Sequence, residues 1–217
     1  MLTKEDCADI SAVVKEMQPG WRERQHGWTL GKATYLDLRE SRNNNDNELL
    51  MTLFRPLYME LLKVLDGRTG YRCILHEGYA YPGFHIYQGN PEMPQGVAYG
   101  GYIHTDYPYR TLGFPDDSTV ITFTLPIELP ENGGGLNYWE AMTEDSFSGW
   151  YADLPSEQQV LFDSQVNYHQ YEVGKLELHD GKFLHQIANM VPTTKDDWRI
   201  TLQGHGVLVD DKMRIYF

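Results

Sequence analysis

A change in the period of the hydrophobic residues near Tyr71 is the feature that most restricts the fold of this chain. Before that point, apolar residues recur at helical spacing, whereas beyond it β-branched and aromatic residues alternate with polar ones in short runs. Turn-forming glycine, proline and asparagine separate these runs. Two helices followed by about nine short strands bury their apolar surface best when the helices pack outside a β-sandwich or barrel.

Two segments before the change predict helices. Thr3, with acidic residues in the turn that follows, is typical of a capped helix start, and this helix should end near Pro19 and Gly20. Leucines at helical spacing predict a second helix over residues 48–65. Pro56 should kink this second helix or mark where it really begins.

The remainder of the chain, from about residue 71, is expected to form the β-core on which the helices pack. The expected strands are residues 73–78, 84–88, 97–104, 119–127, 135–139, 169–173, 175–178, 183–190 and 198–209. Residues 139–165 are acidic and poor in strand signals, which fits either a lid over a binding site or a peripheral helix around residues 156–161.

Composition restricts the class of protein and of partner. The chain has 217 residues, of which 41% are hydrophobic, which predicts one domain with a sizeable core. A formal net charge of -13 argues against nucleic acid or an anionic membrane as the partner and favours a small-molecule substrate. Cys7 and Cys73 are the only cysteines, so neither a disulfide framework nor a thiolate zinc site is expected. With no signal-peptide pattern and no long apolar run, a cytoplasmic location is expected.

Two metal-capable side chains, His104 and Asp106, stand two residues apart at the end of an expected strand. Because side chains alternate along a strand, both lie on one face, where an imidazole nitrogen and a carboxylate oxygen can chelate a first-row divalent metal. Taken alone, such a pair is more often two solvated polar groups. A third ligand from another strand would complete the 2-His-1-carboxylate set, which leaves coordination positions open.

His185 is the candidate for that third ligand. It enters a strand directly after an expected strand and a tight turn. A lone strand histidine is more often a core residue with local hydrogen bonds, but the position of His185 between the His-x-Asp pair and Arg199 reverses that preference. His179, in the preceding turn, competes for the role and ranks second because turn residues are usually solvated.

The strand expected over residues 198–209 has a polar face and an apolar face. The polar face carries Arg199, Thr201, Gln203 and His205, and the opposite face Ile200, Leu202 and Gly204. If the apolar face packs against the helices, Arg199 points into the barrel, where a buried guanidinium requires an anion. Its planar fork suits a carboxylate, and the Thr201 hydroxyl adds a donor. A structural ion pair with Asp196, Asp197 or Glu177 is the alternative.

The order of these motifs resembles the signature of the iron(II)/2-oxoglutarate-dependent oxygenases: His104-x-Asp106, then His185, then Arg199-x-Thr201. The glycine-rich residues 130–136 are similar to the turn those enzymes carry between their metal strands. The resemblance implies a mainly β fold with flanking helices, the double-stranded β-helix or cupin-like jelly roll.

The family's roles carry over to the matching residues. The resemblance implies that His104, Asp106 and His185 bind iron(II), and that Arg199 and Thr201 bind the distal carboxylate of 2-oxoglutarate, with dioxygen as the other cosubstrate. The halogenases of this family lack the metal-binding carboxylate. Because Asp106 is present, the resemblance implies hydroxylation or a related oxidation instead of halogenation.

Further residues have a role to be decided. Tyr87 lies on the same expected strand face as His85. Because a tyrosine beside the keto-acid carboxylate is common in the family, Tyr87 is a candidate cosubstrate ligand. The alternative is an ordinary core tyrosine. Gln203 and His205 share the face of Arg199 and could equally contact a substrate or form core hydrogen bonds. The stretch from Pro82 to Tyr87 resembles, weakly, the members that act on free amino acids.

The function expected is therefore hydroxylation of an unactivated C–H bond of a small polar metabolite, such as a free amino acid or a derivative. Three alternatives stay open. One is a cupin-like sensor or binding protein that holds a metal without turnover. Another is an oxygenase for a peptide or carrier-bound substrate. The third is a cupin-type isomerase or hydrolase, which would usually have a third histidine ligand.

Overall fold

The computed structural model describes residues 1–24, 27–33, 37, 45–89, 102–142, 151–190 and 194–217. Two β-sheets, almost entirely antiparallel, form the centre of the described chain, and helices lie at their flanks. The helices are α1 (Lys4–Glu16), α2 (Asn45–Thr69), α3 (Pro108–Thr111) and α4 (Ser156–Gln165), with short 3-10 turns at Gln18–Gly20 and Tyr151–Asp153. The strands are β1 (Arg22–Arg24), β2 (Gly27–Leu30), β3 (Arg72–Leu75), β4 (Gly83–Gln88), β5 (Val120–Glu128), β6 (Leu136–Trp139), β7 (Asn167–His169), β8 (Glu177–His179), β9 (Leu184–Ile187), β10 (Trp198–Val209) and β11 (Lys212–Tyr216).

The strands form an eight-stranded and a three-stranded sheet. In the larger sheet, β10 pairs with β5 along one edge. Along its other edge, the first half of β10 pairs with β4 and the second half with β11. Beyond these lie β8 next to β5, β2 and β1 next to β4, and β3, which runs parallel to β11. The smaller sheet has the order β7-β6-β9. The long strand β10 is thus the centre of the larger sheet.

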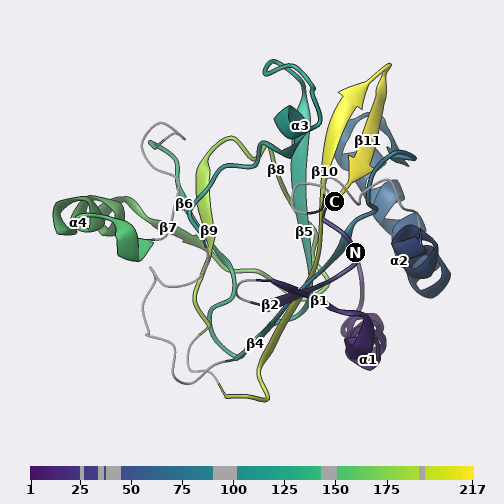
Figure 1. Cartoon of the computed structure of the whole chain (residues 1–217), viewed down its shortest axis with the longest axis horizontal. Coiled ribbons are helices and arrows are strands. Elements are labelled where there is room, and N and C mark those ends of the chain that lie inside the picture. The colour runs from purple at the N-terminus through teal and green to yellow at the C-terminus, as the bar shows by residue number, and fades with distance from the viewer. Residues whose placement is uncertain (25–26, 34–36, 38–44, 90–101, 143–150, 191–193) are drawn as a thin grey trace.

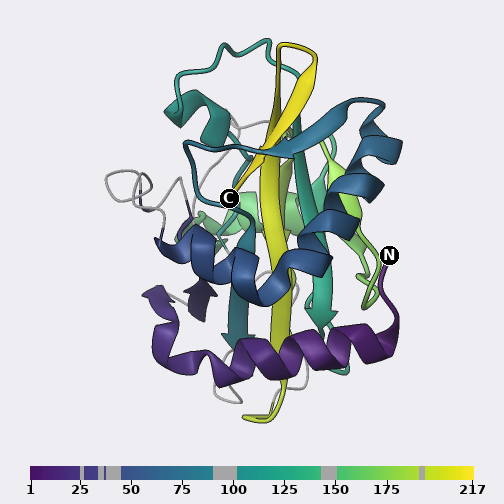
Figure 2. The same cartoon turned by 90° about the vertical axis from the view of Figure 1, so that its right-hand side faces the viewer.

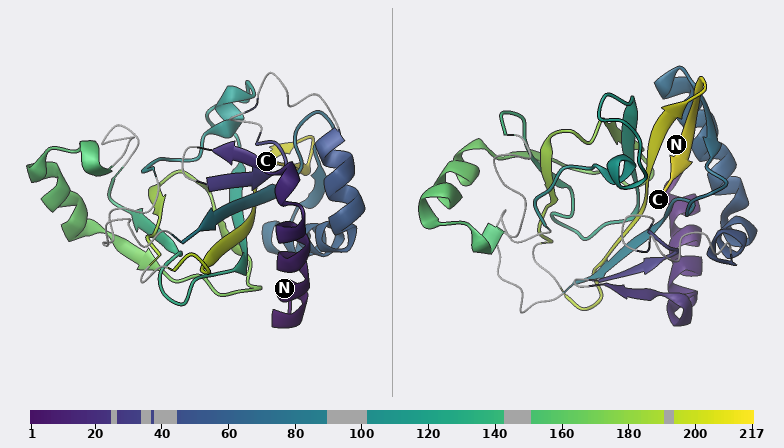
Figure 3. Two further views of the ribbon diagram at one scale, coloured as in Figure 1. Left: turned by 60° about the horizontal axis from the view of Figure 1, so that its bottom comes forward. Right: turned by 45° about the horizontal axis from the view of Figure 1, so that its top comes forward.

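The two sheets lie opposite each other, with the larger sheet next to α1 and α2 and the smaller one next to α4 (Figure 1). Seen from the side, α1 and α2 cross the outer face of the larger sheet (Figure 2). Helix α4 stands on the far side of the smaller sheet, away from the other two helices (Figure 3). Each sheet therefore has an inner face turned toward the other sheet.

Side-chain alternation along β10 explains which face the helices cover. Ile200 and Leu202 are fully buried in one apolar cluster with Leu50 and Leu61 of α2, together with Phe123 of β5. The alternate residues of β10, beginning with Arg199, occupy the inner face. The expected division of this strand into an apolar face toward the helices and a polar inner face is confirmed.

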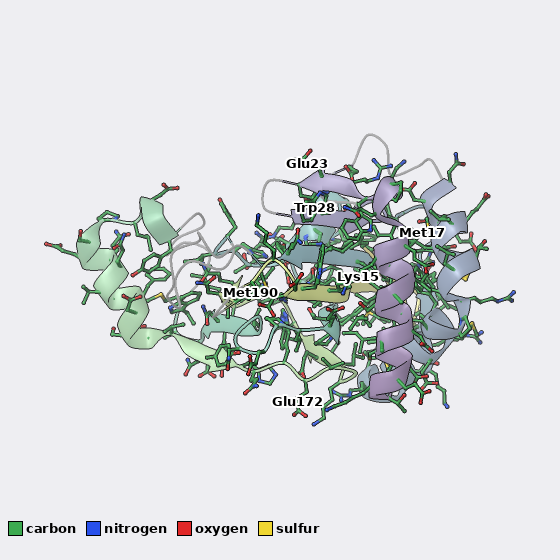
Figure 4. The ribbon with its side chains drawn as sticks, turned by 90° about the horizontal axis from the view of Figure 1, so that it is seen from below. Lys15, Met17, Glu23, Trp28, Glu172 and Met190 are labelled. Atoms are coloured by element: carbon green, nitrogen blue, oxygen red, sulfur yellow. The ribbon has the colours of Figure 1, made fainter. Side chains whose placement is uncertain are left out.

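Helix α1 begins and docks as its sequence predicts. The Thr3 hydroxyl accepts from the amide of Asp6, and the Asp6 carboxylate accepts from the amide of Thr3, which completes a capping box. Ser11 and Lys15 both donate to Glu128 at the end of β5, with 2.8 Å from Lys15 Nζ to the carboxylate. In Figure 4, Lys15 extends from the side of α1 that faces the sheet. These contacts tie the helix to the sheet.

Helix α2 has the kink that Pro56 predicts. Phe54, two residues earlier, leaves helical geometry with φ −124° and ψ 22°, because the proline ring excludes the carbonyl of the preceding turn and removes one amide donor. The helix begins at Asn45 and runs past residue 65 to Thr69, where Gly70 adopts φ +75°. The expected helix was therefore right in kind and too short at both ends.

Several strand expectations need correction. The expected strand 169–173 is wrong, since β7 ends at His169 and the chain then leaves the sheet. Strands β1, β2 and β11 were not expected. β1 is short and charged, and β11 follows a tight hairpin at Asp210 and Asp211, both of which have positive φ. Most of the expected strand 97–104 lies outside the described residues, as does part of the expected lid or helix region at residues 143–150. No helix among the described residues is long and apolar enough to cross a membrane.

Candidate metal centre

His104, Asp106 and His185 come together as the sequence predicts. One ligand atom from each lies within 4.8 Å of the others. The carboxylate is shared between the two rings, with 3.5 Å from His104 Nε2 to Asp106 Oδ1 and 3.3 Å from His185 Nε2 to Asp106 Oδ2. His185 and Asp106 are mostly buried, whereas His104 is partly exposed. Two of the three side chains are therefore shielded from solvent, and the third is partly open to it.

Backbone pairing fixes the positions of all three residues. His104 and His185 form an isolated antiparallel bridge, in which each amide donates to the other's carbonyl at 3.0 and 2.9 Å. The Asp106 amide donates to the Gly181 carbonyl at 2.8 Å. Residues far apart in the sequence are thus held in one register, so their side chains converge without a loop having to close over them.

The two imidazole rings are oriented by the same local contact. His104 Nδ1 lies 2.7 Å from the Tyr102 carbonyl, and His185 Nδ1 lies 3.0 Å from the Phe183 carbonyl. Because a carbonyl only accepts, each Nδ1 carries a proton, which leaves Nε2 as the metal-binding nitrogen. This hydrogen bond to the second nitrogen is typical of metal-binding histidines.

Charge in the cluster favours a cation. Burial alone would raise the pKa of Asp106, but attraction to His185 and hydrogen bonds from His104 and His185 outweigh it and hold that pKa well below its usual range. The carboxyl group is therefore ionised. The two Nε2 atoms face this same carboxylate, an arrangement that suits a divalent metal.

The donor set fits iron(II). Two imidazole nitrogens and one carboxylate oxygen form the 2-His-1-carboxylate set that non-haem iron(II) oxygenases use. Among the described residues no fourth metal-ligating side chain belongs to the cluster, whereas a structural zinc site would use four. The set would leave positions at the metal open to other molecules.

Arg199 is a buried cation on the inner face of β10. Its side chain is 1% exposed; Nε donates to the Gly134 carbonyl at 2.7 Å and Nη1 to the Thr201 hydroxyl at 3.3 Å. Nη2 is buried without a hydrogen-bond partner among the described residues. No carboxylate in the described part of the chain pairs with Arg199; Asp197 instead accepts from Thr194, and Glu177 pairs with His169. The alternative of a structural ion pair is therefore not supported.

Two tyrosines frame the guanidinium. The rings of Tyr87 and Tyr171 lie 5.7 and 5.8 Å from the Arg199 guanidinium carbon. Tyr87 is the direct neighbour of Arg199 across β4 and β10. Burial raises the pKa of both phenols, so both are neutral donors at pH 7. The charge of Arg199 lowers the pKa of Tyr171 and the charge of Asp106 raises it, although burial outweighs both.

Sequence reasoning missed Tyr171 and the role of Gly134. Tyr171 was included in an expected strand, although in the structure it follows the end of β7. Gly134 belongs to the glycine-rich turn and supplies the carbonyl that orients Arg199. Its φ of +70° is unfavourable for any residue with a side chain. A run of three glycines before a strand was the available signal.

Other polar residues of the inner face complete the surroundings. His205 Nδ1 lies 3.1 Å from the Thr122 hydroxyl, and Gln203 donates to the Thr124 hydroxyl at 3.3 Å. These contacts favour the core hydrogen-bonding interpretation of Gln203 and leave a substrate contact of His205 as a prediction. Burial, together with the charge of Arg199, lowers the pKa of His85 to about 3, so this ring is neutral at pH 7.

His179 is not part of the metal cluster. It ends β8, and its Nδ1 accepts a hydrogen bond from the Gly181 amide at 2.9 Å. Burial and the neighbouring His185 lower the pKa of His179 to about 4. The ranking of His179 behind His185 as a ligand agrees with this arrangement, although His179 is only partly exposed and its ring packs against that of His185.

Comparison with known proteins finds no matching family model and no matching curated protein. Among solved structures, the chain is similar to an N-substituted L-amino acid dioxygenase from Burkholderia ambifaria AMMD, with 17% identity and a TM-score of 0.44 over 63% of this chain and 53% of that one. For the same enzyme in complex with alpha-KG, the identity is 15% and the TM-score 0.43, over 64% and 53% of the two chains. The chain thus spans about half the length of these structures. Any function has to be argued from the site itself.

Proposed function

We propose that this protein is an iron(II)- and 2-oxoglutarate-dependent oxygenase that hydroxylates an unactivated C–H bond of a small polar metabolite. The observation that carries the proposal is the combination of a three-ligand cluster, His104, Asp106 and His185, with a buried arginine that lacks a carboxylate partner among the described residues. In this proposal the two facing sheets form a double-stranded β-helix.

The two features together fit a dicarboxylate. A metal held by three protein ligands accepts oxygen donors from a second molecule. One terminal nitrogen of Arg199 donates to Thr201, and the other has no partner among the described residues. The guanidinium therefore suits a carboxylate at the other end of that molecule. 2-Oxoglutarate carries a keto acid at one end and a carboxylate at the other, and so matches both.

Each residue then has a defined role. His104, Asp106 and His185 would hold iron(II), and Arg199 and Thr201 would bind the distal carboxylate, while the neutral phenol of Tyr87 is a candidate additional donor. When bound, iron(II) with 2-oxoglutarate and dioxygen supplies the oxidising power for C–H hydroxylation, with succinate and carbon dioxide as co-products. The carbonyls of Tyr102 and Phe183 keep both rings oriented toward the metal.

The proposed substrate is a free amino acid or a derivative. The neutral histidines and hydroxyl groups of the inner face offer hydrogen bonds to a small polar molecule, and the acidic surface disfavours polyanions. A peptide or carrier-bound substrate is distinguished by a screen for succinate release, in which free amino acids and short peptides are compared directly.

The first test is anaerobic titration of the metal-free protein with iron(II) and then 2-oxoglutarate. Chelation of the keto acid to iron is expected to produce a weak visible charge-transfer band. Asp106→Ala should abolish the band and all succinate formation. Arg199→Ala should weaken binding of 2-oxoglutarate by about 10²-fold, as expected for loss of a buried charge-assisted pair worth roughly 2–3 kcal/mol.

Arg199→Lys is the matched control, because it keeps the charge but loses the planar fork; its affinity should lie between that of wild type and of the alanine variant. Normal 2-oxoglutarate turnover by Asp106→Ala and Arg199→Ala would refute the assignment. Metal retention without the band, and without succinate, would instead support a cupin-like binding or sensor protein.

A further inference from the structure

Gly181, in the turn between β8 and β9, holds the backbone of Asp106. Gly181 uses both of its backbone groups there: its amide donates to His179 Nδ1 at 2.9 Å, and its carbonyl accepts from the Asp106 amide at 2.8 Å. The ring of His179 is therefore linked to the backbone of a proposed metal ligand through one residue.

Space around Gly181 leaves no room for a side chain. A Cβ atom at this position would lie 2.7 Å from Asp106 Cβ and 2.9 Å from Thr122 Oγ1. Gly181 also has φ +70°, which L-residues with a side chain rarely adopt. The Gly181 backbone thus lies close against Asp106 and accepts its amide, so a rotation of the Gly181 peptide would disturb Asp106.

We propose that His179 is a positioning residue for Asp106: its Nδ1 holds the Gly181 amide, and the Gly181 carbonyl in turn holds the metal-binding carboxylate in place. This inference rests on the proposed metal site. A chelating cluster tolerates displacements of only a few tenths of an ångström in its ligands, so a contact that fixes one ligand's backbone affects affinity. His179 acts through Gly181 and would not touch the metal.

The competing interpretation is that His179 serves only as a packing ring. Its ring centroid lies 4.9 Å from that of Phe183 and 5.2 Å from that of His185. Two substitutions separate the interpretations. His179→Asn keeps an acceptor at the position of Nδ1 and loses the ring, whereas His179→Phe keeps a ring and loses the acceptor.

The chain offers a matched control in a second histidine that accepts from the amide of a glycine two residues later. His76 Nδ1 accepts from the Gly78 amide at 3.1 Å across an intervening acid, Glu77, just as Asp180 intervenes in the first turn. His76 packs against Tyr79, with 4.2 Å between the ring centroids, and not against the three proposed ligands. His76→Phe therefore removes the same hydrogen bond without touching the metal cluster.

The experiment measures cobalt(II) affinity by calorimetry for the full-length wild type and variants that retain a cooperative unfolding transition. His179→Asn and His76→Phe should bind cobalt(II) within about threefold of wild type, whereas His179→Phe should bind it 10- to 100-fold more weakly, the range expected when a group supporting a metal ligand is lost. Gly181→Ala should weaken binding as much or more, because it displaces Asp106 directly.

A second readout needs no metal. Hydrogen exchange of the Asp106 amide in the metal-free protein should be at least about tenfold faster in His179→Phe than in wild type or His179→Asn, because the acceptor of that amide is no longer held. Equal cobalt affinity and equal exchange in His179→Phe and wild type would overturn the positioning role, as would a loss confined to His179→Asn. A wild type that binds no cobalt(II) would overturn the proposed function, while the exchange comparison would still decide the role of His179.

Discussion

Arg199 lies in the interior with its charge uncompensated by any carboxylate of the described residues. Burial lowers the pKa of its guanidinium. The guanidinium donates to the Gly134 carbonyl and the Thr201 hydroxyl, and it lies beside the neutral phenols of Tyr87 and Tyr171. Removing a full charge from water without a counter-charge costs free energy of folding. Such a cost is expected at a site that awaits an anion.

Replacing this arginine should therefore separate stability from binding. Arg199→Met, which fills a similar volume, should raise the free energy of unfolding of the metal-free protein by about 1–2 kcal/mol, as found when buried charges are replaced by apolar residues. Urea denaturation measures the change. Lys175→Met, at an exposed lysine, is the control and should stay within about 0.5 kcal/mol. A less stable Arg199→Met protein would contradict the view that the arginine is retained for binding.

Strand β10 shows how one element serves both folding and function. Its apolar residues, such as Leu202, lie in the cluster beneath α1 and α2, whereas Arg199 and Thr201 lie on the inner face. Because successive side chains point to opposite faces, neighbouring positions on this strand have separate energetic roles.

Two adjacent substitutions test this division. Leu202→Ala should lower the free energy of unfolding by about 2–5 kcal/mol through loss of a buried leucine, and should leave the affinity of the folded protein for 2-oxoglutarate within about threefold. Thr201→Val should change stability by less than about 1.5 kcal/mol and weaken 2-oxoglutarate binding about fivefold, the effect of one hydrogen bond. Urea denaturation and calorimetry with cobalt(II) present give both values. Unchanged affinity in Thr201→Val would remove that residue from the binding site.

In the whole molecule, the proposed binding groups belong to different sheets. His185 is on β9 of the smaller sheet and pairs with His104, whereas Arg199 is on β10 of the larger one. A molecule that reached both the metal and Arg199 would therefore connect the two sheets. Metal and 2-oxoglutarate should then stabilise the fold cooperatively.

Thermal unfolding measured with cobalt(II), 2-oxoglutarate, or both tests this coupling. Each ligand that binds only the folded state at a hundredfold excess over its Kd adds about 2.7 kcal/mol. 2-Oxoglutarate alone should raise Tm little, and it should raise Tm by several degrees more when the metal is present. Asp106→Ala should abolish this extra shift. Equal shifts from 2-oxoglutarate with and without metal would show that the keto acid does not use the metal cluster.

Local signals explain which features the sequence predicts. The capped start of α1, the kink at Pro56 and the bounds of β10 depend on a hydroxyl cap, a proline ring and strict alternation, all of which act between near neighbours. The spacing of His104 and Asp106 and the order of the later motifs were enough to name the three residues that the structure brings together. Short charged strands such as β1 carry little local signal, because pairing with a neighbouring strand decides their structure.

The sequence by itself determined the change from helix to strand and the two faces of β10, because these follow from periodicity along the chain. It also named the three clustered residues, through the resemblance of their order to the motif of a known family. Only the tertiary structure decided that Tyr171 stands beside Arg199, that the Gly134 carbonyl orients it, and that His179 reaches Asp106 through Gly181. Those contacts join segments whose separation in the sequence leaves no periodic trace. They exist because two sheets pack face to face and bring distant backbone groups within hydrogen-bonding distance.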